Sequence, residues 1–429
     1  MNGLSFRTLA VSTFTAIAFA LMSVNISAEP LRLGSGQVPT IAFSPDGAIL
    51  AASHRTDPES DIYSTQVVIL WDPQTHQQVD MLEMLNIYVM AFSPDGTLLA
   101  LGGDDHKIHL WDVAGRNEVG LMQSPSHLDV TSLVFSPDGK TLASSGGGDK
   151  MVYLWDVQSQ QQVGTLRGHT GLGVVAIVFS PDGRLIFSGG HRGDEAIRIW
   201  DVQAQQQVGE LAGHSDVTYD LAFSPDGTIL ASAGGWNDKA VYLWDVQTQN
   251  QVGMLGGHLA HVLSIAFSLN GKIPASTVNW DDTIHFWDIE KQEHVGIFEH
   301  HDAIDSGWAS YVAFSSDGKW LACGSEDGVE LWELDRPDKA LTELMLLVMS
   351  EFHFGNVDAE LAWDSLVNVQ AALAALDTGN LDEAQAALNA LEALITQNKN
   401  PRAGRITPEA AAEIVQRATE IIIIVALGQ

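Results

Sequence analysis

Serine, histidine and aspartate recur together in this sequence, and these are the residue types that carry out nucleophilic hydrolysis. One such set comprises His169, Ser188 and Asp194, and comparable sets accompany His214 and His258. In a hydrolase, the histidine would take the proton of the serine hydroxyl while the aspartate orients the imidazole. A catalytic set is singular and lies in a cleft, whereas these sets repeat along the chain, each beside a tryptophan. The repetition favours a structural role for these residues, and we do not expect an enzyme.

Metal and cofactor sites are not indicated by the spacing of the remaining polar residues. Acidic pairs such as Asp104-Asp105 and Asp281-Asp282 have ligands that suit calcium, but no Asp-x-Asp-x-Asp-Gly loop occurs. Zinc would need closely spaced cysteine and histidine ligands, and Cys323 is the only cysteine. The glycine runs match neither a P-loop nor a dinucleotide-binding fingerprint. We therefore expect no metal and no cofactor.

The elements that position these residues follow an internal repeat of about 44 residues. The string Phe-Ser-Pro-Asp-Gly, in five full and two altered copies, begins at Phe43, Phe92, Phe135, Phe179, Phe223, Phe267 and Phe314. A tryptophan followed by an acid recurs in phase at Trp71, Trp111, Trp155, Trp200, Trp244, Trp287 and Trp332. Each repeat holds four strand-like apolar runs, and Asp-Gly between two such runs is a strong hairpin signal. The pattern predicts seven four-stranded antiparallel blades in a β-propeller.

Over residues 31–334 the sequence resembles the WD40-repeat family, through its Gly-His, turn aspartate and Trp-Asp motifs. The resemblance implies a mainly β fold, a seven-bladed WD40 propeller. It also implies that a histidine, a strand serine, a loop aspartate and the tryptophan form a structural hydrogen-bond network within a blade. Full sets are His127, Ser144, Asp149 and Trp155; His169, Ser188, Asp194 and Trp200; His214, Ser232, Asp238 and Trp244; and His258, Ser276, Asp281 and Trp287. In the other blades Ala52, Leu101 and Cys323 replace the serine, so those networks are incomplete.

Closure of the ring has two candidates in the sequence. Residues 29–33 align with the end of a fourth strand, as at residues 210–213, and would complete blade seven. Residues 340–344 could fill the same position but lack the Val-Gly pair found at residues 208–209. We expect the N-terminal strand to close the ring.

Departures from the repeat indicate where a partner binds. In the family, the loops between the second and third strands and the loops entering the first strand emerge on one face. Long insertions of this kind occur at residues 54–66 in blade one and 299–309 in blade seven. Loop aromatics and arginines on a rigid scaffold are typical of binding surfaces, although a loop tryptophan can also pack back on its own blade. We expect a footprint centred on blades seven and one, with candidate residues Arg55, Tyr63, His191, Arg192, Trp236, Trp280, His300, His301 and Trp308.

A small all-α domain is expected over residues 339–429, where the apolar period changes from two to 3.6. Leu366, Leu373 and Leu376 mark one helix, and residues 381–395 mark a second with Asn380 as its N-cap. A Thr-Pro-Glu start at residue 407 opens a third helix, and residues 341–352 predict a fourth. The Leu-Asp-Glu-Ala hairpin and the Thr-Pro-Glu start weakly resemble helical modules at the C-termini of exported bacterial proteins.

Residues 1–28 have the features of a signal peptide. Arg7 precedes an apolar stretch over residues 9–22, and small residues at 26–28 match a cleavage site. We therefore expect an exported protein, periplasmic or extracellular, whose propeller domain runs over residues 29–338. The single cysteine excludes an internal disulfide.

Charge and motifs together predict a binding scaffold. The chain has 54 acidic and 21 basic residues and a formal net charge of −33, which disfavours nucleic acid and anionic lipid as partners. No stable membrane insertion is expected, because the apolar runs are short. We predict a non-enzymatic scaffold that recognises a protein or peptide. A glycan-binding propeller and a propeller hydrolase or lactonase remain alternatives, and the oligomeric state stays open.

Overall fold

The computed structural model describes most of the chain between residues 30 and 421. The described stretches are residues 30–55, 65–85, 87–125, 127–146, 148–278, 283–299, 311–325, 327–334, 359–377, 380–398, 406–407, 410–411, 414–418 and 421. Two compact units are present, one over Pro30–Glu333 and one that contains the C-terminal helices. Each unit is described by itself.

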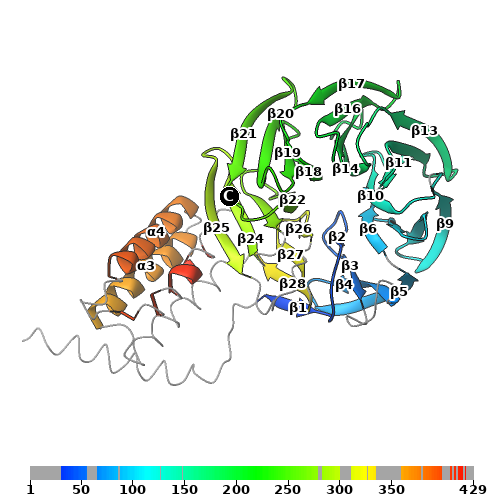
Figure 1. Ribbon diagram of the computed structural model, residues 1–429. Helices are drawn as coiled ribbons and strands as arrows, with labels where there is room; N and C mark the ends of the chain where they lie inside the picture. The colour runs from blue at the N-terminus through cyan, green and yellow to red at the C-terminus, as the bar shows by residue number, and fades with distance from the viewer. Residues whose placement is uncertain are drawn as a thin grey trace, which may run out of the picture. The chain divides into compact units, whose positions relative to one another are not determined.

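The first unit is a ring of seven four-stranded antiparallel sheets, which are the blades of a β-propeller (Figure 1). Blades one and two hold β2 (Ile41–Phe43), β3 (Leu50–Arg55), β4 (Thr65–Asp72), β5 (Gln77–Leu85), β6 (Ile87–Phe92), β7 (Leu98–Gly103), β8 (Lys107–Asp112) and β9 (Asn117–Gln123). Blades three and four hold β10 (Val130–Phe135), β11 (Thr141–Gly146), β12 (Met151–Asp156), β13 (Gln161–Arg167), β14 (Val174–Phe179), β15 (Leu185–Gly190), β16 (Ile197–Asp201) and β17 (Gln206–Leu211). Blades five and six hold β18 (Thr218–Phe223), β19 (Ile229–Gly234), β20 (Ala240–Asp245), β21 (Asn250–Gly256), β22 (Val262–Phe267), β23 (Pro274–Val278), β24 (Thr283–Asp288) and β25 (Glu293–Glu299). Blade seven holds β26 (Val312–Phe314), β27 (Trp320–Ser325), β28 (Gly328–Glu333) and the N-terminal strand β1 (Leu31–Leu33).

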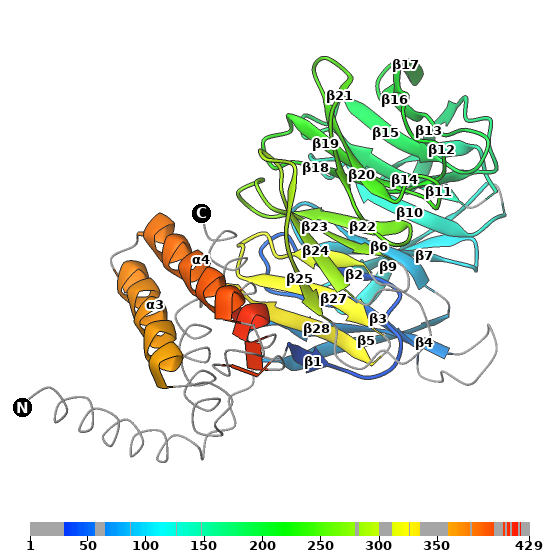
Figure 2. The ribbon, with the colours of Figure 1, turned by 60° about the vertical axis from the view of Figure 1, so that its left-hand side comes forward.

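The ring closes through the N-terminal strand. β1 pairs antiparallel with β28, with Leu31 opposite Leu331 (Figure 2). Arg32 adds ion pairs to Asp327 at 3.8 Å and to the buried Glu330 at 3.6 Å. The expectation that residues 29–33 complete blade seven is therefore confirmed for the strand β1, whereas residues 340–344 lie outside the described residues.

The turn of the first hairpin, Ser-Pro-Asp-Gly in five blades and altered in two, is held by local hydrogen bonds, which explains why its sequence recurs. In blade five the Ser224 hydroxyl donates to the Asp226 carboxylate at 2.6 Å and accepts the N–H of Ile229 at 3.0 Å. Gly227 has φ +71°, a conformation that glycine adopts without strain. The hydrogen bond from Ser224 also lowers the pKa of the Asp226 carboxyl. Asn270 takes the place of the aspartate in blade six and makes the same contacts.

The apolar core of the propeller lies between successive blades. Phe187 of blade four packs in one cluster with Leu230 and Trp244 of blade five, and none of the three is more than 1% exposed. A single blade would leave such faces in water, so the ring is what makes the repeat stable.

The second unit contains helices α3 (Ala359–Asp377) and α4 (Leu381–Asn398). Asn380 is confirmed as the N-cap of α4, because the N–H of Glu383 donates to Asn380 Oδ1 at 3.2 Å. The Glu383 carboxylate accepts from the Asn380 side-chain amide at 2.8 Å, whereas the Asn380 backbone N–H donates to the carbonyl of Ala375. Ala384, Leu388 and Leu391 form the buried face of α4. The third helix starts as expected, with the N–H of Ala410 donating to the Thr407 hydroxyl at 3.2 Å.

The helix predicted from Leu366, Leu373 and Leu376 is confirmed as α3. Leu366 and Leu373 are only half-buried, whereas Leu361, Val369 and Ala372 are fully buried. α3 packs against α4. The expected helix over residues 341–352 lies outside the described residues. None of the described helices is long and apolar enough to cross a membrane.

Candidate binding face

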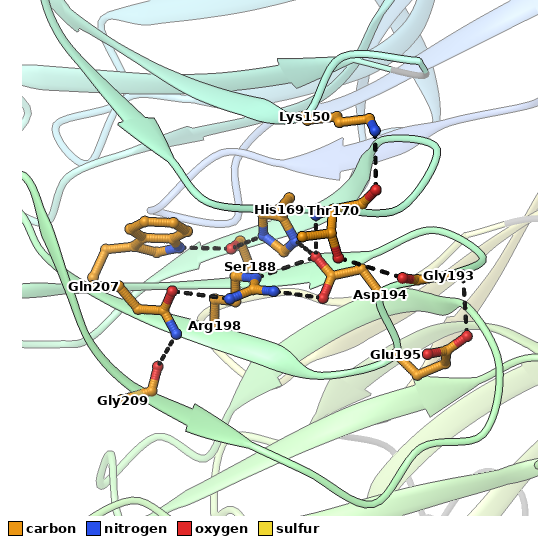
Figure 3. Close-up of polar contacts among 11 residues, drawn as sticks. Lys150, His169, Thr170, Ser188, Gly193, Asp194, Glu195, Arg198, Gln207 and Gly209 are labelled. Carbon is orange, nitrogen blue, oxygen red and sulfur yellow. Dashed lines mark hydrogen bonds and ion pairs between the residues drawn. The ribbon is translucent and has the colours of Figure 1, made fainter.

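The described histidine, serine and aspartate of blade four form a closed network with tryptophan (Figure 3). The Trp200 indole N–H donates to Ser188 Oγ at 2.7 Å, and Ser188 Oγ lies 2.6 Å from His169 Nε2. His169 Nδ1 lies 2.7 Å from Asp194 Oδ2. The Ser188 hydroxyl then donates to His169 Nε2, and His169 Nδ1–H donates to the Asp194 carboxylate. In this arrangement the Trp200 N–H, the Ser188 hydroxyl and both His169 ring nitrogens have a hydrogen-bond partner.

The lowered pKa of His169 agrees with a neutral imidazole in this network. Burial lowers the pKa of the His169 imidazole, although the Asp194 carboxylate acts in the opposite sense. Burial alone would raise the pKa of the Asp194 carboxyl, but hydrogen bonds from Arg198 and Thr170 hold it below its usual value. Ser188 is 0% exposed, so a substrate carbonyl cannot reach this hydroxyl while the blade is intact. The geometry is that of a structural network rather than an open nucleophile site.

Blade five repeats the network, with His214 Nδ1 at 2.8 Å from Asp238 and Nε2 at 2.6 Å from Ser232. The Trp244 indole donates to the same serine at 2.8 Å. In blade six, Ser276 Oγ accepts from Trp287 at 2.9 Å and lies 3.3 Å from His258 Nε2. Asp281, the fourth expected member there, lies outside the described residues.

The set proposed for blade three is wrong in its histidine. Trp155 donates to Ser144 at 2.8 Å, but Asp149 accepts from the Tyr153 hydroxyl at 2.8 Å, and His127 is exposed at φ +52°. A glycine precedes the histidine in blades four to six. In blade four, a Cβ added at Gly168 would lie 3.0 Å from the Trp200 ring. Blade three has Ser126 at this position in the sequence.

We call the end of the ring that carries the loops between second and third strands, and the loops entering the first strands, the loop face. On the loop face, Arg192 lies close to Asp216 and Trp236 lies close to His261. Neither neighbour was predicted from the sequence. The Asp216 carboxylate accepts the N–H of Asn237 at 3.1 Å and lies 4.0 Å from Arg192 Nε. Asp216 is 6% exposed, whereas the Arg192 side chain is 67% exposed. The buried Asp216 carboxylate therefore hydrogen-bonds to the loop that contains Trp236 and pairs with Arg192, whose side chain is exposed to solvent.

Tyr219, Trp236 and His261 form an aromatic cluster beside this ion pair. The His261 ring stacks on Tyr219 with centroids 5.1 Å apart and packs at 5.1 Å against Trp236. Lys239 Nζ lies 5.3 Å from the Trp236 ring centre and donates to the carbonyl of Leu259 at 2.9 Å. Burial lowers the pKa of His261, opposed by the Asp216 charge, and burial raises the pKa of Tyr219. The cluster presents Trp236, 36% exposed, at its rim.

A β-bulge explains why Tyr219 reaches this cluster. The pairing register of β18 with β19 shifts between Thr218 and Asp220, so Tyr219 is an extra residue. Bulges redirect a side chain, and the same shift occurs around Tyr88 in blade two. The available sequence signal was a tyrosine four residues before the turn phenylalanine in both blades.

The other predicted binding residues are dispersed or untested. Arg55 donates to the Gln37 side chain at 2.8 Å and lies near Tyr88, whose pKa it lowers against the larger effect of burial. His191 is half-buried next to Arg192. The remaining five, on blades one, six and seven, lie outside the described residues: Tyr63, Trp280, His300, His301 and Trp308. The expected centre on blades seven and one thus stays a prediction, while the described cluster lies on blades four to six. Among the described residues, no group of three His, Cys, Asp or Glu side chains is placed to hold a metal ion.

Comparison with known proteins agrees with this architecture. The family model described as WD domain, G-beta repeat matches residues 84–112, 121–156, 160–201, 205–245, 249–288 and 292–329. Over 107 residues, 24% of this chain, the sequence is 32% identical to a Periodic tryptophan protein 2 homolog of Schizosaccharomyces pombe. That stretch spans only 11% of the relative's own length. With repeat matches over more than half of its residues, this chain belongs to the WD40 family of G-beta repeat proteins.

Proposed function

We propose that this chain is a non-enzymatic scaffold that binds a protein or peptide through the loop face of its propeller. The observation that carries the proposal is the pairing of an exposed Arg192 with the aromatic cluster, both fixed through the buried Asp216. Arginine and tryptophan are enriched in binding hot spots: tryptophan buries a large area at a low cost in conformational entropy, and the planar arginine guanidinium donates several hydrogen bonds. The buried Ser-His-Asp networks support a role without catalysis.

Affinity capture with the full chain tests this function. We expect Trp236→Ala and Arg192→Ala each to weaken binding of a captured and then purified partner at least tenfold, as hot-spot truncations do. Val208→Ala is the matched control, because Val208 is 54% exposed on the outer strand β17. Capture that survives both loop-face substitutions would contradict the proposal. Binding on a glycan array that depends on Trp236 would instead support a lectin.

We further propose that the protein is exported and acts outside the cytoplasm. The basic, apolar and small-residue segments of residues 1–28 support this location. Mass spectrometry of the native protein should find a mature N-terminus at Glu29. An intact N-terminus in a cytoplasmic fraction would contradict it.

A further inference from the structure

The innermost strand of each blade places one residue at an equivalent position, three residues before the turn phenylalanine. We call these residues the inner ring, and they are Thr40, Val89, Ser132, Ala176, Asp220, Ser264 and Tyr311. Asp220 is the one member of the inner ring with a carboxylate. An inner-ring residue that differs so strongly from its six equivalents calls for a physical explanation.

A structural role explains only part of the choice of aspartate. Ser132 Oγ accepts the N–H of Ile177 in the next blade at 3.2 Å, and Ser264 Oγ accepts the N–H of Val312 at 3.4 Å. Asp220 Oδ2 does the same for Ile265 at 2.9 Å. A serine therefore suffices to link two blades by this hydrogen bond. The link does not require the negative charge of Asp220.

The charge is also unfavourable where it lies. Burial raises the pKa of the Asp220 carboxyl to about 6, and the groups that lower it are neutral donors: the N–H groups of Ile265 and Leu221 and the Ser264 hydroxyl. The adjoining strands β14, β19 and β22 contain no titratable side chain. Tyr311, whose pKa is raised to about 12 by burial and by the Asp220 charge, is the nearby ionisable group. A buried charge without a basic partner is destabilising, and none of the groups that hydrogen-bond to Asp220 is basic.

Asp220 lies on the strand edge that faces the centre of the ring (Figure 1). β18 is hydrogen-bonded on one edge only, to β19, and its other edge faces the ring centre (Figure 1). Asp220 is partly exposed there, and Tyr311 is 37% exposed. Asp220 lies two residues inside the first residue of β18, about 7 Å from the loop face. Tyr219, adjacent in sequence, belongs to the aromatic cluster on the loop face.

We propose that Asp220 binds the cationic end of a lysine or arginine side chain, inserted from the loop face by the partner. The inference rests on the proposed function and names the chemistry of that partner. An ammonium or guanidinium group would donate charge-assisted hydrogen bonds to the carboxylate, with Tyr311 as the neighbouring aromatic residue. The net charge of −33 attracts a cationic partner toward the ring. A single carboxylate supplies too few oxygen ligands for calcium, which takes six to eight.

NMR titration of the full chain, labelled at aspartate, tests the site with defined probes. Acetyl-arginine methylamide and acetyl-lysine methylamide should shift the Asp220 carboxyl carbon and lower its pKa by about one unit. The neutral acetyl-alanine methylamide should do neither. Asp220→Ser keeps the link between blades, as in blades three and six, and should weaken probe binding at least tenfold. Asp226→Asn removes the same charge from a turn where blade six naturally has Asn270, and should leave probe binding unchanged.

Three results would overturn the inference. One is an equal affinity of the arginine probe for the wild type and for Asp220→Ser, when melting temperatures show that both proteins are folded. Another is an Asp220 shift caused by calcium chloride but not by the arginine probe. The third is a partner that binds Asp220→Ser and wild type equally yet is lost in Trp236→Ala, which would leave the proposed function intact. Conversely, probe binding at Asp220 without any captured partner would support the cation site and count against the scaffold function.

Discussion

The side-chain amide of Gln205 in blade four donates a hydrogen bond to the backbone carbonyl of Val163 in blade three, at 3.1 Å. Val163 is the extra residue of a bulge in β13, and Gln205 has φ +52° in the turn after Trp200-Asp201. The contact recurs from Gln160 to Val119 and from Gln292 to Val252, at 2.9 Å in both cases. It links neighbouring blades at their outer strands, where few apolar contacts do so.

The glycine after the bulged valine is required by this contact. A Cβ at Gly164 would lie 2.6 Å from the Gln205 amide nitrogen. We expect Gly164→Ala and Gln205→Ala each to lower the free energy of unfolding by about 1 kcal/mol. The double variant should lose less than the sum, because both changes remove one contact. Urea unfolding measures this, with Val163→Ala as the control that keeps the carbonyl; additive losses would show that the contact contributes nothing.

The indole nitrogens of Trp71 and Trp111 are buried without a hydrogen-bond partner, in the two blades where Ala52 and Leu101 replace the network serine. Ala52→Ser should supply an acceptor to Trp71, as Ser188 does for Trp200 at 2.7 Å. We expect a gain of about 1 kcal/mol in the free energy of unfolding. Ser188→Ala is the reciprocal change and should cost about 2 kcal/mol, because it leaves the Trp200 indole N–H and His169 Nε2 without their partner. A loss of stability in Ala52→Ser would contradict this explanation.

Acid should weaken the network of blade five. Burial alone would raise the pKa of Asp238, but hydrogen bonds from His214 and Ser215 hold it below its usual value of 3.8. The folded state then binds fewer protons than the unfolded chain, so this stabilisation is present above about pH 4 and is lost as the pH falls through the folded pKa. Asp238→Asn should therefore destabilise the protein at pH 7 and make little difference near pH 2. An equal loss at both pH values would show that the charge is not involved.

Asp220 should have the opposite pH dependence. Its pKa is raised from 3.8 to about 6, so the folded state binds the proton more tightly than the unfolded chain. Stability therefore falls as the pH rises from about 4 to 6 and stays low above that range. Asp220→Asn should remove this penalty, which amounts to about 3 kcal/mol at most, at pH 7 but not at pH 4. A melting temperature at pH 7 that drops in Asp220→Asn would contradict the assigned direction.

Features that depend on local contacts can be predicted from the sequence, whereas features that depend on a neighbouring blade are harder to predict. The seven turns follow from hydrogen bonds within five residues, such as Ser224 to Asp226, and so the strands and blade number were predictable. The exposed position of His127 was not predicted, although Ser126 replaces the glycine that precedes the other network histidines in the sequence. The Tyr219 bulge and the contact between Gln205 and Val163 also arise only when strands pair and blades meet. The binding residues of blades one, six and seven that lie outside the described residues remain predictions.

Site-specific photo-crosslinking tests the central claim, that the loop face of blades four to six binds the partner, most directly. Leu259 is 77% exposed on a loop that accepts a hydrogen bond from Lys239, and a benzophenone side chain there would leave the aromatic cluster intact. The same side chain at Val208, on the outer strand, is the control. We predict a crosslinked partner from position 259 and none from position 208. A partner crosslinked from position 208 and not from position 259 would contradict the assignment of this face.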